Sequence, residues 1–91
     1  MVLQSPILLL DGVTTTGASA AIFPDGAPVT IVISGITTAT VNIEGSVDGT
    51  NFEAIQAKTA DACVIVSPST KYIRANVAAH TTGTITVKAL Y

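Results

Sequence analysis

Residues 39–55, ATVNIEGSVDGTNFEAI, contain the feature that most restricts the fold of this chain. Apolar and polar side chains alternate along residues 41–47, and this period of two is typical of a strand with one buried face. Asp48 and Gly49 follow, and such a pair is a strong hairpin signal because glycine accepts a positive φ and aspartate bonds its own backbone. The stretch predicts two antiparallel strands, with Asp48 and Gly49 making the turn and Phe52 anchoring the returning strand.

The rest of the chain also favours strands. Val, Ile and Thr make up more than a third of the residues, and these β-branched side chains fit strands better than helices. No window has the apolar spacing of an amphipathic helix. Further strands are predicted at residues 7–10, 18–23, 29–34, 61–66, 71–79 and 84–91. Strands at spacings of about ten residues predict an all-β fold: a small antiparallel β-sandwich or jelly roll of six to eight strands, with no substantial helix, or alternatively a small closed barrel.

Glycine and polar residues between these runs predict where the chain turns. Residues 11–12, Asp-Gly, are expected to close the first strand in a turn. Residues 35–38 are expected to form a short link into the 39–55 hairpin. Residues 80–83 are expected to form the loop of a second hairpin, which joins the last two strands.

The pattern also predicts where individual side chains lie. The nearly continuous apolar run 61–66 is typical of a strand buried on both faces, and Cys63 within it is expected to be a small buried hydrophobe. Glu44 is expected on an outward, solvated face, opposite Arg74 or Lys88. Such cross-strand pairs stabilise a sheet without indicating a function.

Ninety-one residues are expected to form a single domain, residues 1–91, with residues 1–6 as an N-terminal arm that ends at a proline. The longest apolar run, residues 7–10, is far too short to span a bilayer, so no membrane association is expected. No secretory signal peptide is expected either, because no basic residue precedes that run.

The composition favours a protein that stays in contact with neighbours. Only 11% of the residues are charged, against about 25% in typical soluble domains, while 48% are hydrophobic. A surface with so little charge is poorly protected against association. An ordinary soluble β-domain with threonine on its wet faces remains the alternative. The net charge of −2 provides no basic field for phosphates, so no nucleic-acid partner is expected.

No residue pattern predicts a chemical reaction. A nucleophilic triad needs a base, and the single histidine, His80, lies in a predicted loop. One Cys and one His cannot complete a structural zinc site, and the 48–51 turn offers one carboxylate where calcium requires six to eight oxygen ligands. No glycine-rich loop precedes a helix. We therefore expect no catalytic residue, no metal, no cofactor and no enzymatic activity.

Two segments, GSVDGTNFEAI and KYIRANVAAHTTGTITVKALY, resemble small β-sandwich virion proteins of tailed bacteriophages. The resemblance covers about half of the chain. The matching residues are Gly45, Ser46, Asp48, Gly49 and Phe52 in the first segment, and Tyr72, Ile73, Arg74, Thr82, Gly83 and Thr84 in the second. Similar hairpins also occur in sugar-binding sandwich domains, where the motif is structural.

The resemblance implies a capsid decoration (cement) protein. Such a protein binds the outer capsid shell, bridges neighbouring major capsid proteins and contacts sister copies, for which a homotrimer is expected. It would be found on the outer capsid surface of the virion after assembly in the host cytoplasm. The residues expected to contact these partners are the N-terminal arm and a threonine-rich loop: Met1, Val2, Leu3, Gln4, Ser5, Pro6, Thr14, Thr15 and Thr16.

The alternative is a carbohydrate-binding module associated with a tail or fibre. Sugar sites use stacking aromatic side chains beside polar groups, and this chain has no Trp and only two Phe and two Tyr. Phe52 and Tyr91 are expected to point inward. Few aromatic side chains would then remain for a sugar platform.

Overall fold

The computed structural model describes residues 6–91, and it confirms the all-β, antiparallel class. Its six strands are β1 (Ile7–Val13), β2 (Gly17–Ala18), β3 (Val29–Ser46), β4 (Glu53–Lys58), β5 (Ala62–Val66) and β6 (Tyr72–Leu90). Within the described range there is no helix, and hence none that could cross a membrane.

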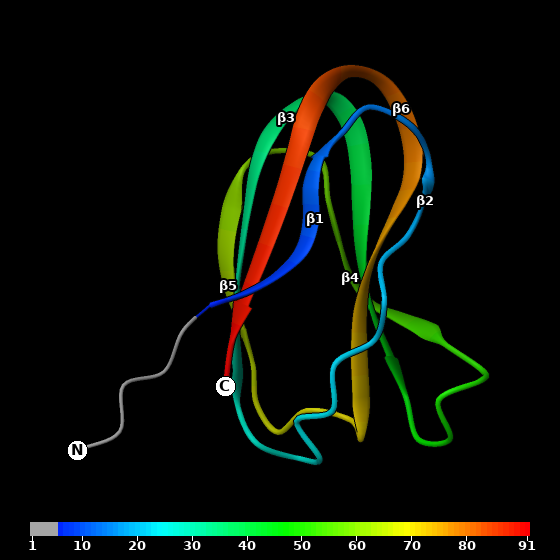
Figure 1. Ribbon diagram of the computed structural model, residues 1–91, viewed down its shortest axis with the longest axis vertical. Helices are drawn as coiled ribbons and strands as arrows, with labels where there is room; N and C mark the ends of the chain where they lie inside the picture. The colour runs from blue at the N-terminus through cyan, green and yellow to red at the C-terminus, as the bar shows by residue number, and fades with distance from the viewer. Residues whose placement is uncertain (1–5) are drawn as a thin grey trace.

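The two long strands, β3 and β6, form the spine of the molecule. They pair antiparallel along their whole length, from Thr30 opposite Leu90 to Ser46 opposite Tyr72. Both strands bend sharply near their middle, so the ladder arches over the top of the molecule in Figure 1. The four shorter strands add to its two edges, which gives one continuous six-stranded sheet.

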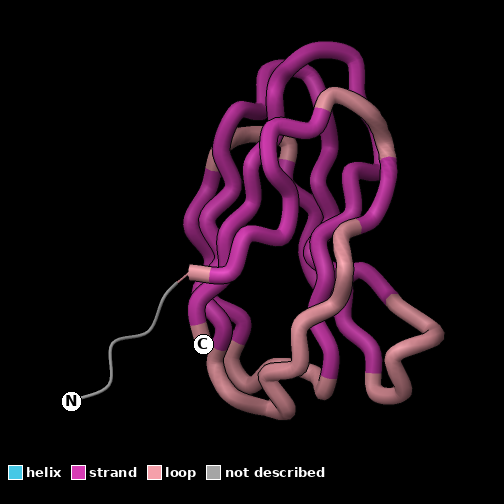
Figure 2. Tube along the Cα trace, viewed as in Figure 1, coloured by secondary structure: helices cyan, strands magenta, loops and turns pink. Residues whose placement is uncertain are grey.

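The bend divides the sheet into two parts that face each other. The first half-sheet contains β1, β5, residues 29–34 of β3 and residues 84–90 of β6. The second half-sheet contains β2, β4, residues 39–46 of β3 and residues 72–79 of β6. Figure 2 shows the strands of both parts passing into one another over the arch. Hydrogen bonds along β3 and β6 join the two parts into a single sheet.

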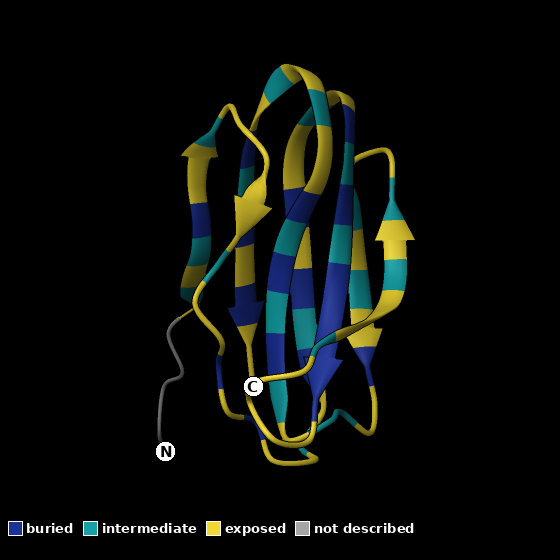
Figure 3. Cartoon of the chain, turned by 90° about the vertical axis from the view of Figure 1, so that its right-hand side faces the viewer, coloured by how far each residue is buried: buried dark blue, intermediate teal, exposed yellow. Residues whose placement is uncertain are grey.

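The hydrophobic core lies between the two half-sheets. The alternation of side chains places every second residue of β3 and β6 on the inner side, and Figure 3 shows the resulting buried bands along the central strands. The fully buried large side chains are Val29, Ile31, Ile33, Val41, Ile43, Ile73, Val77, Ile85 and Val87. Both half-sheets thus contribute to one core.

Two glycines make the arch possible where the long strands bend together. Gly35 of β3 has φ +85° and Gly83 of β6 has φ +122°, which are conformations that residues with a Cβ rarely adopt. A Cβ on Gly35 would overlap the carbonyl oxygen of Thr84, and a Cβ on Gly83 would lie 2.5 Å from the carbonyl oxygen of Gly35. The register shifts repeatedly between Ser34 and Val41, so β-bulges accompany the bend.

Three predicted turns are wrong, two of them because of the arch. Residues 35–38 and 80–83 lie within β3 and β6, because the paired strands bend together and do not end. Residues 11–12 lie within β1, where a register shift between Leu10 and Val13 marks an irregularity in its pairing with β6. The long hairpin predicted from residues 80–83 is therefore absent, since β6 is one strand.

The prediction that residues 61–66 are buried on both faces is also wrong. Among the described strands β5 pairs with β3 alone, so it forms an edge of the first half-sheet as far as the structure describes it. Cys63 and Ile65 point outward and are exposed, while Val66 is buried. The apolar composition of β5 is that of a central strand buried on both faces, although β5 is an edge strand with one exposed face. Composition alone therefore does not distinguish the two kinds of strand.

Candidate docking surface

The outer side of the first half-sheet carries a group of exposed apolar side chains. In one cross-strand row Leu8 lies opposite Lys88, Lys88 opposite Val32, and Val32 opposite Cys63. In the next row Thr30 lies between Leu90 and Ile65. We call this surface the apolar outer face, and its members are Leu8, Thr30, Val32, Cys63, Ile65, Lys88 and Leu90. Ile65 is 65% exposed, Leu8 48% and Val32 44%.

An open groove of about 210 Å³ lies on this face, where β1 begins and β6 ends. It is lined by Pro6, Thr30, Val32, Lys88, Ala89 and Leu90. Lys88 is the one charged residue among them, and its aliphatic stem can lie along apolar surface while its ammonium group reaches water. The groove and its surroundings are suited to burying apolar side chains of a partner.

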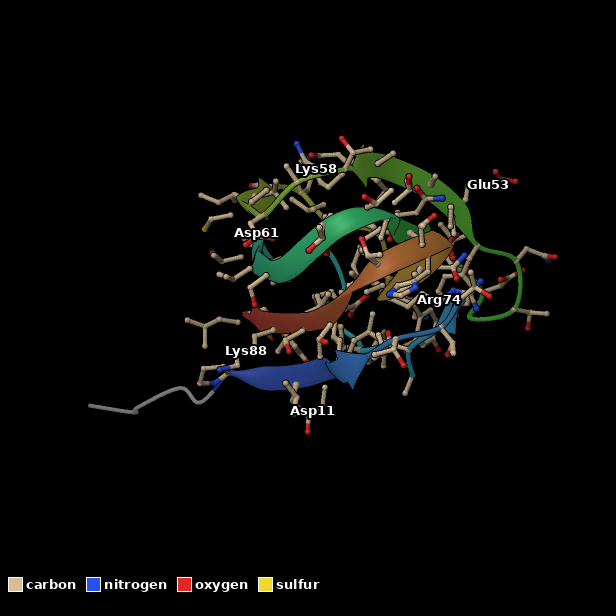
Figure 4. The ribbon with its side chains drawn as sticks, turned by 90° about the horizontal axis from the view of Figure 1, so that it is seen from above. Asp11, Glu53, Lys58, Asp61, Arg74 and Lys88 are labelled. Carbon is tan, nitrogen blue, oxygen red and sulfur yellow. The ribbon has the colours of Figure 1, made fainter. Side chains whose placement is uncertain are left out.

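The outer side of the second half-sheet has a different chemistry. Glu44 is buried there, with one carboxylate oxygen accepting a hydrogen bond from Arg74 Nε at 2.7 Å and the other accepting one from Asn76 Nδ2 at 3.0 Å. The guanidinium carbon of Arg74 lies 4.0 Å from the centre of the Phe52 ring. In Figure 4, Arg74 and Lys88 lie on opposite sides of the molecule, so the polar cluster is well separated from the apolar outer face.

This cluster corrects two expectations. Glu44 pairs with Arg74 across the strands as predicted, but it is buried and not solvated, because Arg74, Asn76 and the neighbouring strands surround it. Phe52 does not point into the core: it is half-buried and covers Arg74 on the outer side of the sheet. The aromatic ring thereby shields an ion pair, which is consistent with a structural role.

The loop between β3 and β4 contains Asp48 and Gly49 and is closed by its own hydrogen bonds. Asp48 Oδ1 accepts from the backbone N–H groups of Thr50 and Asn51, both at 2.9 Å, and from the Ser46 hydroxyl at 2.8 Å. Asp48 Oδ2 accepts from Asn51 Nδ2 at 3.0 Å. Gly49 has φ +80° and lies against the Tyr72 ring. The Asp48 carboxylate thus accepts its hydrogen bonds from groups of the loop itself and stabilises the turn.

These hydrogen bonds make Asp48 sensitive to acid. The bonds from the backbone N–H groups of Asn51 and Thr50, followed by those from Ser46 and the Asn51 side chain, hold the pKa of Asp48 far below its usual range. Because this pKa is lower in the folded chain, the ionised carboxylate contributes stability that is fully present above the unfolded value of about 3.9 and is lost as the pH falls below it.

We therefore expect Asp48→Asn to reduce the loss of stability between about pH 5 and about pH 2. The measurement is the urea midpoint of unfolding at a series of pH values for both proteins. Asp11→Asn is the control, because Asp11 is an exposed carboxylate in β1, and it should retain the steep acid dependence of the wild type. Equal acid dependence in wild type and Asp48→Asn would contradict the prediction.

A pair of aromatic rings lies at the end of the molecule opposite the arch. Phe23 and Tyr72 stack with their centroids 5.1 Å apart and their planes inclined by 27°. The Lys71 ammonium lies 5.6 Å from the Phe23 centroid, and Phe23 remains 48% exposed. Tyr91, which was expected to point inward, is 38% exposed because β6 ends at Leu90 before it.

The partner-binding residues predicted from the resemblance are only partly placed by the structure. Met1, Val2, Leu3, Gln4 and Ser5 lie outside the described residues. Pro6 lines the groove of the apolar outer face. Thr14, Thr15 and Thr16 are exposed in the connection between β1 and β2, and none of them lines the groove.

The sequence prediction missed Leu8, Val32, Ile65 and Leu90 as candidate docking residues. A signal was present for two of them. Val32 stands among polar residues on the mixed face of the 29–34 run, and Leu90 does the same in the last strand. An apolar residue on an otherwise polar strand face is exposed, and several such residues on neighbouring strands form an exposed apolar patch of the kind that marks an interaction site.

The single histidine, His80, contacts the backbone. His80 Nε2 lies 2.8 Å from the carbonyl oxygen of Gly83, so the ring nitrogen donates to the backbone within the arch of β6. Among residues 6–91 no three side chains of His, Cys, Asp or Glu are grouped so that they could hold a metal ion.

Comparison with known proteins supplies no further assignment: no protein-family model, no curated protein and no solved structure matches the chain.

Proposed function

We propose that the chain is a structural virion protein, specifically a capsid decoration (cement) protein of a tailed bacteriophage. In this role it binds the outer capsid shell, bridges neighbouring major capsid proteins and contacts sister copies on the outside of the virion. It acts by adhesion and is not an enzyme. The observation that supports the proposal is the apolar outer face, on a chain whose charged fraction is only 11%.

The size and chemistry of the apolar outer face suit a permanent contact. A standard interface takes about 800 Å² from each partner, which is about a sixth of the 4993 Å² of accessible surface of this chain. One broad side of so small a molecule is enough to provide that area. Burial of Leu8, Val32 and Leu90 is favourable, at about 25 cal/mol for each Å² of apolar surface. Only the ammonium group of Lys88 has to be kept in contact with water or an acidic partner group.

The experiment begins with virions purified from the native source of the chain. We expect the protein on DNA-filled heads, at a copy number comparable to that of the major shell protein. Heads stripped of it should regain heat resistance when the purified protein is added. Its absence from heads, or heads that gain no stability from it, would overturn the proposal.

Two matched variants locate the contact. Val32→Glu places a carboxylate in the apolar outer face and should weaken rebinding to stripped heads by at least about tenfold. Val47→Glu makes the same change at a residue that is 77% exposed in the β3–β4 loop, and it should bind like the wild type. Equal binding by both variants would show that the apolar outer face is not the contact.

The second candidate function is a carbohydrate-binding module of a tail or fibre. The exposed Phe23–Tyr72 stack favours it, because aromatic faces bind sugar rings. Phe23 stacks on Tyr72 and has the Lys71 ammonium nearby, so the ring face toward Tyr72 is not available to a sugar, although Phe23 is 48% exposed. Specific binding on a glycan array that is lost in Phe23→Ala, together with no effect on capsids, would favour this function over the cement role.

A further inference from the structure

The four short strands of the sheet differ in how well their free edges are protected. β1 has two register shifts and carries Asp11, and β2 is only two residues long. β4 has a register shift against β3 and carries Glu53 and Lys58. Natural proteins use such bulges, charges and short lengths to prevent pairing with another strand.

β5 has none of these protections. Its sequence, ACVIV, contains no charge and no proline, and its register with β3 is uninterrupted from Val66 to Ala62. Among residues 6–91 it pairs with β3 alone, so within this range its other edge presents unpaired backbone N–H and C=O groups. Figure 4, which has the colours of Figure 1, shows the first half-sheet from above with β5 at its margin beside β3. The chemistry of this edge is that of a site for an added strand.

The same strand of a second copy fits this edge. An antiparallel pair with its two-fold axis at Val64 places Ala62 opposite Val66 and Cys63 opposite Ile65. Cys63 and Ile65 both point outward, while Ala62, Val64 and Val66 belong to the inner side, so like sides meet. The apolar outer faces of the two copies then become one continuous surface.

Charge also permits this two-fold pairing. No charged residue lies within β5, and Asp61 just before it would stand opposite Ser67 of the second copy. The two Asp61 carboxylates would be about 20 Å apart, six residues along a strand, which exceeds the screening length of about 8 Å. Asp61 Oδ1 already accepts a hydrogen bond from the Ile36 N–H at 2.9 Å within its own chain. Pro68 follows the strand and ends the ladder, since it has no N–H to donate.

We propose that two copies of this chain associate through antiparallel pairing of their β5 strands, which joins their first half-sheets across a two-fold axis. The pairing uses the strand edge and leaves the apolar outer faces free for another partner. It requires no capsid, so it can hold or fail independently of the proposed function. A two-fold pair also differs from the homotrimer that the family resemblance implied.

Sedimentation analysis at increasing concentration of the purified chain tests the proposal. The wild type should reach the mass of a dimer. Ile65→Lys puts a charge at the centre of the pairing edge and should raise the dimer dissociation constant by at least about tenfold. Leu8→Lys is the matched control on the same outer side, and it should dimerise like the wild type because β1 lies at the other edge of the half-sheet. Circular dichroism and thermal unfolding of both variants check that they remain folded.

A cross-link tests the register. Ile65→Cys should form a covalent dimer on mild oxidation, because its new thiol would face Cys63 of the second copy within the reach of a disulfide. Val47→Cys places a thiol in the β3–β4 loop, at a position that is 77% exposed against 65% for Ile65, and should not form that dimer efficiently. A wild-type monomer at all concentrations, a trimer, or Ile65→Cys without enhanced cross-linking would each overturn the proposal.

Discussion

Gly35→Ala is expected to lower the free energy of unfolding by about 3 kcal/mol or more, which is a large part of the about 5–14 kcal/mol available to a chain of this size. The backbone of Gly35 has φ +85°, which an alanine adopts only with strain, and the new Cβ would overlap the carbonyl oxygen of Thr84 on the facing strand. The two strands would have to separate at the arch, where the ladder is already irregular. The measurement is urea unfolding followed by far-UV circular dichroism.

Gly26→Ala separates strain from overlap. Gly26 also has a positive φ, +87°, but a Cβ there would meet no atom within 4 Å. It is expected to cost about 1 kcal/mol, the lower end for a strained residue. Equal stability of the two variants would contradict the prediction, because it would mean that the overlap of a Cβ with Thr84 adds nothing to the backbone strain at position 35.

Ile31→Ala is expected to cost about 2–5 kcal/mol, because it removes buried methyl groups and leaves a cavity in the core. Ile31 is fully buried on β3, between Val64 of β5 and Ala89 of β6. The neighbouring strands β5 and β6 are hydrogen-bonded to β3 in a fixed register. A shift by one residue would move every inner side chain to the outer side of the sheet, so these strands cannot slide to fill the space. The cavity therefore cannot close easily.

Ile65→Ala is the control for this prediction. It makes the same chemical change in the same half-sheet, at a side chain that is 65% exposed, and it should alter stability by about 0.5 kcal/mol or less. Both variants are compared by urea unfolding at one low protein concentration, so that association does not contribute. Similar losses in the two variants would contradict the assigned core.

The inner side of the central strands could be predicted from the sequence because side-chain alternation is a local property. The pattern of residues 29–34 and 41–45 identifies the apolar residues that prove to be buried there, and the predicted strands 71–79 and 84–91 do the same for β6 as far as Ala89. The pattern fails at Val47, which lies beyond the end of β3 and is 77% exposed. The hairpin of residues 39–55 likewise corresponds to β3 and β4. These features depend on neighbours two residues apart.

The arch could not be predicted, because it depends on residues that are far apart in the chain. In the sequence, Gly35 and Gly83 each look like turn residues. Their role in the arch becomes visible only in the structure, where they lie close together across the ladder. Glu44 was misplaced for a similar reason: its burial results from Arg74 and Asn76, which lie about thirty residues away along the chain.

The docking surface was also hidden in the sequence. Leu8, Val32 and Leu90 come from three strands and meet only through the register of the first half-sheet. The residues predicted from the resemblance instead form two stretches of sequence, 1–6 and 14–16. Among those that the structure describes, Pro6 lines the groove and residues 14–16 do not. To predict a contact surface that is built from several strands, the register of those strands must be known. The register could not be predicted from this single sequence.

The long ladder of β3 and β6 has a consequence for the order in which the molecule forms. At one end it joins Ser46 to Tyr72, and at the other it joins Thr30 to Leu90, so the loop closed by pairing is much shorter at the first end. Because the entropic cost of closure grows with loop length, pairing is favoured to begin in the second half-sheet and to extend over the arch. The apolar outer face would then be completed last, when the second half-sheet is already paired, so a partner that recognises this face would bind only a chain that is nearly folded.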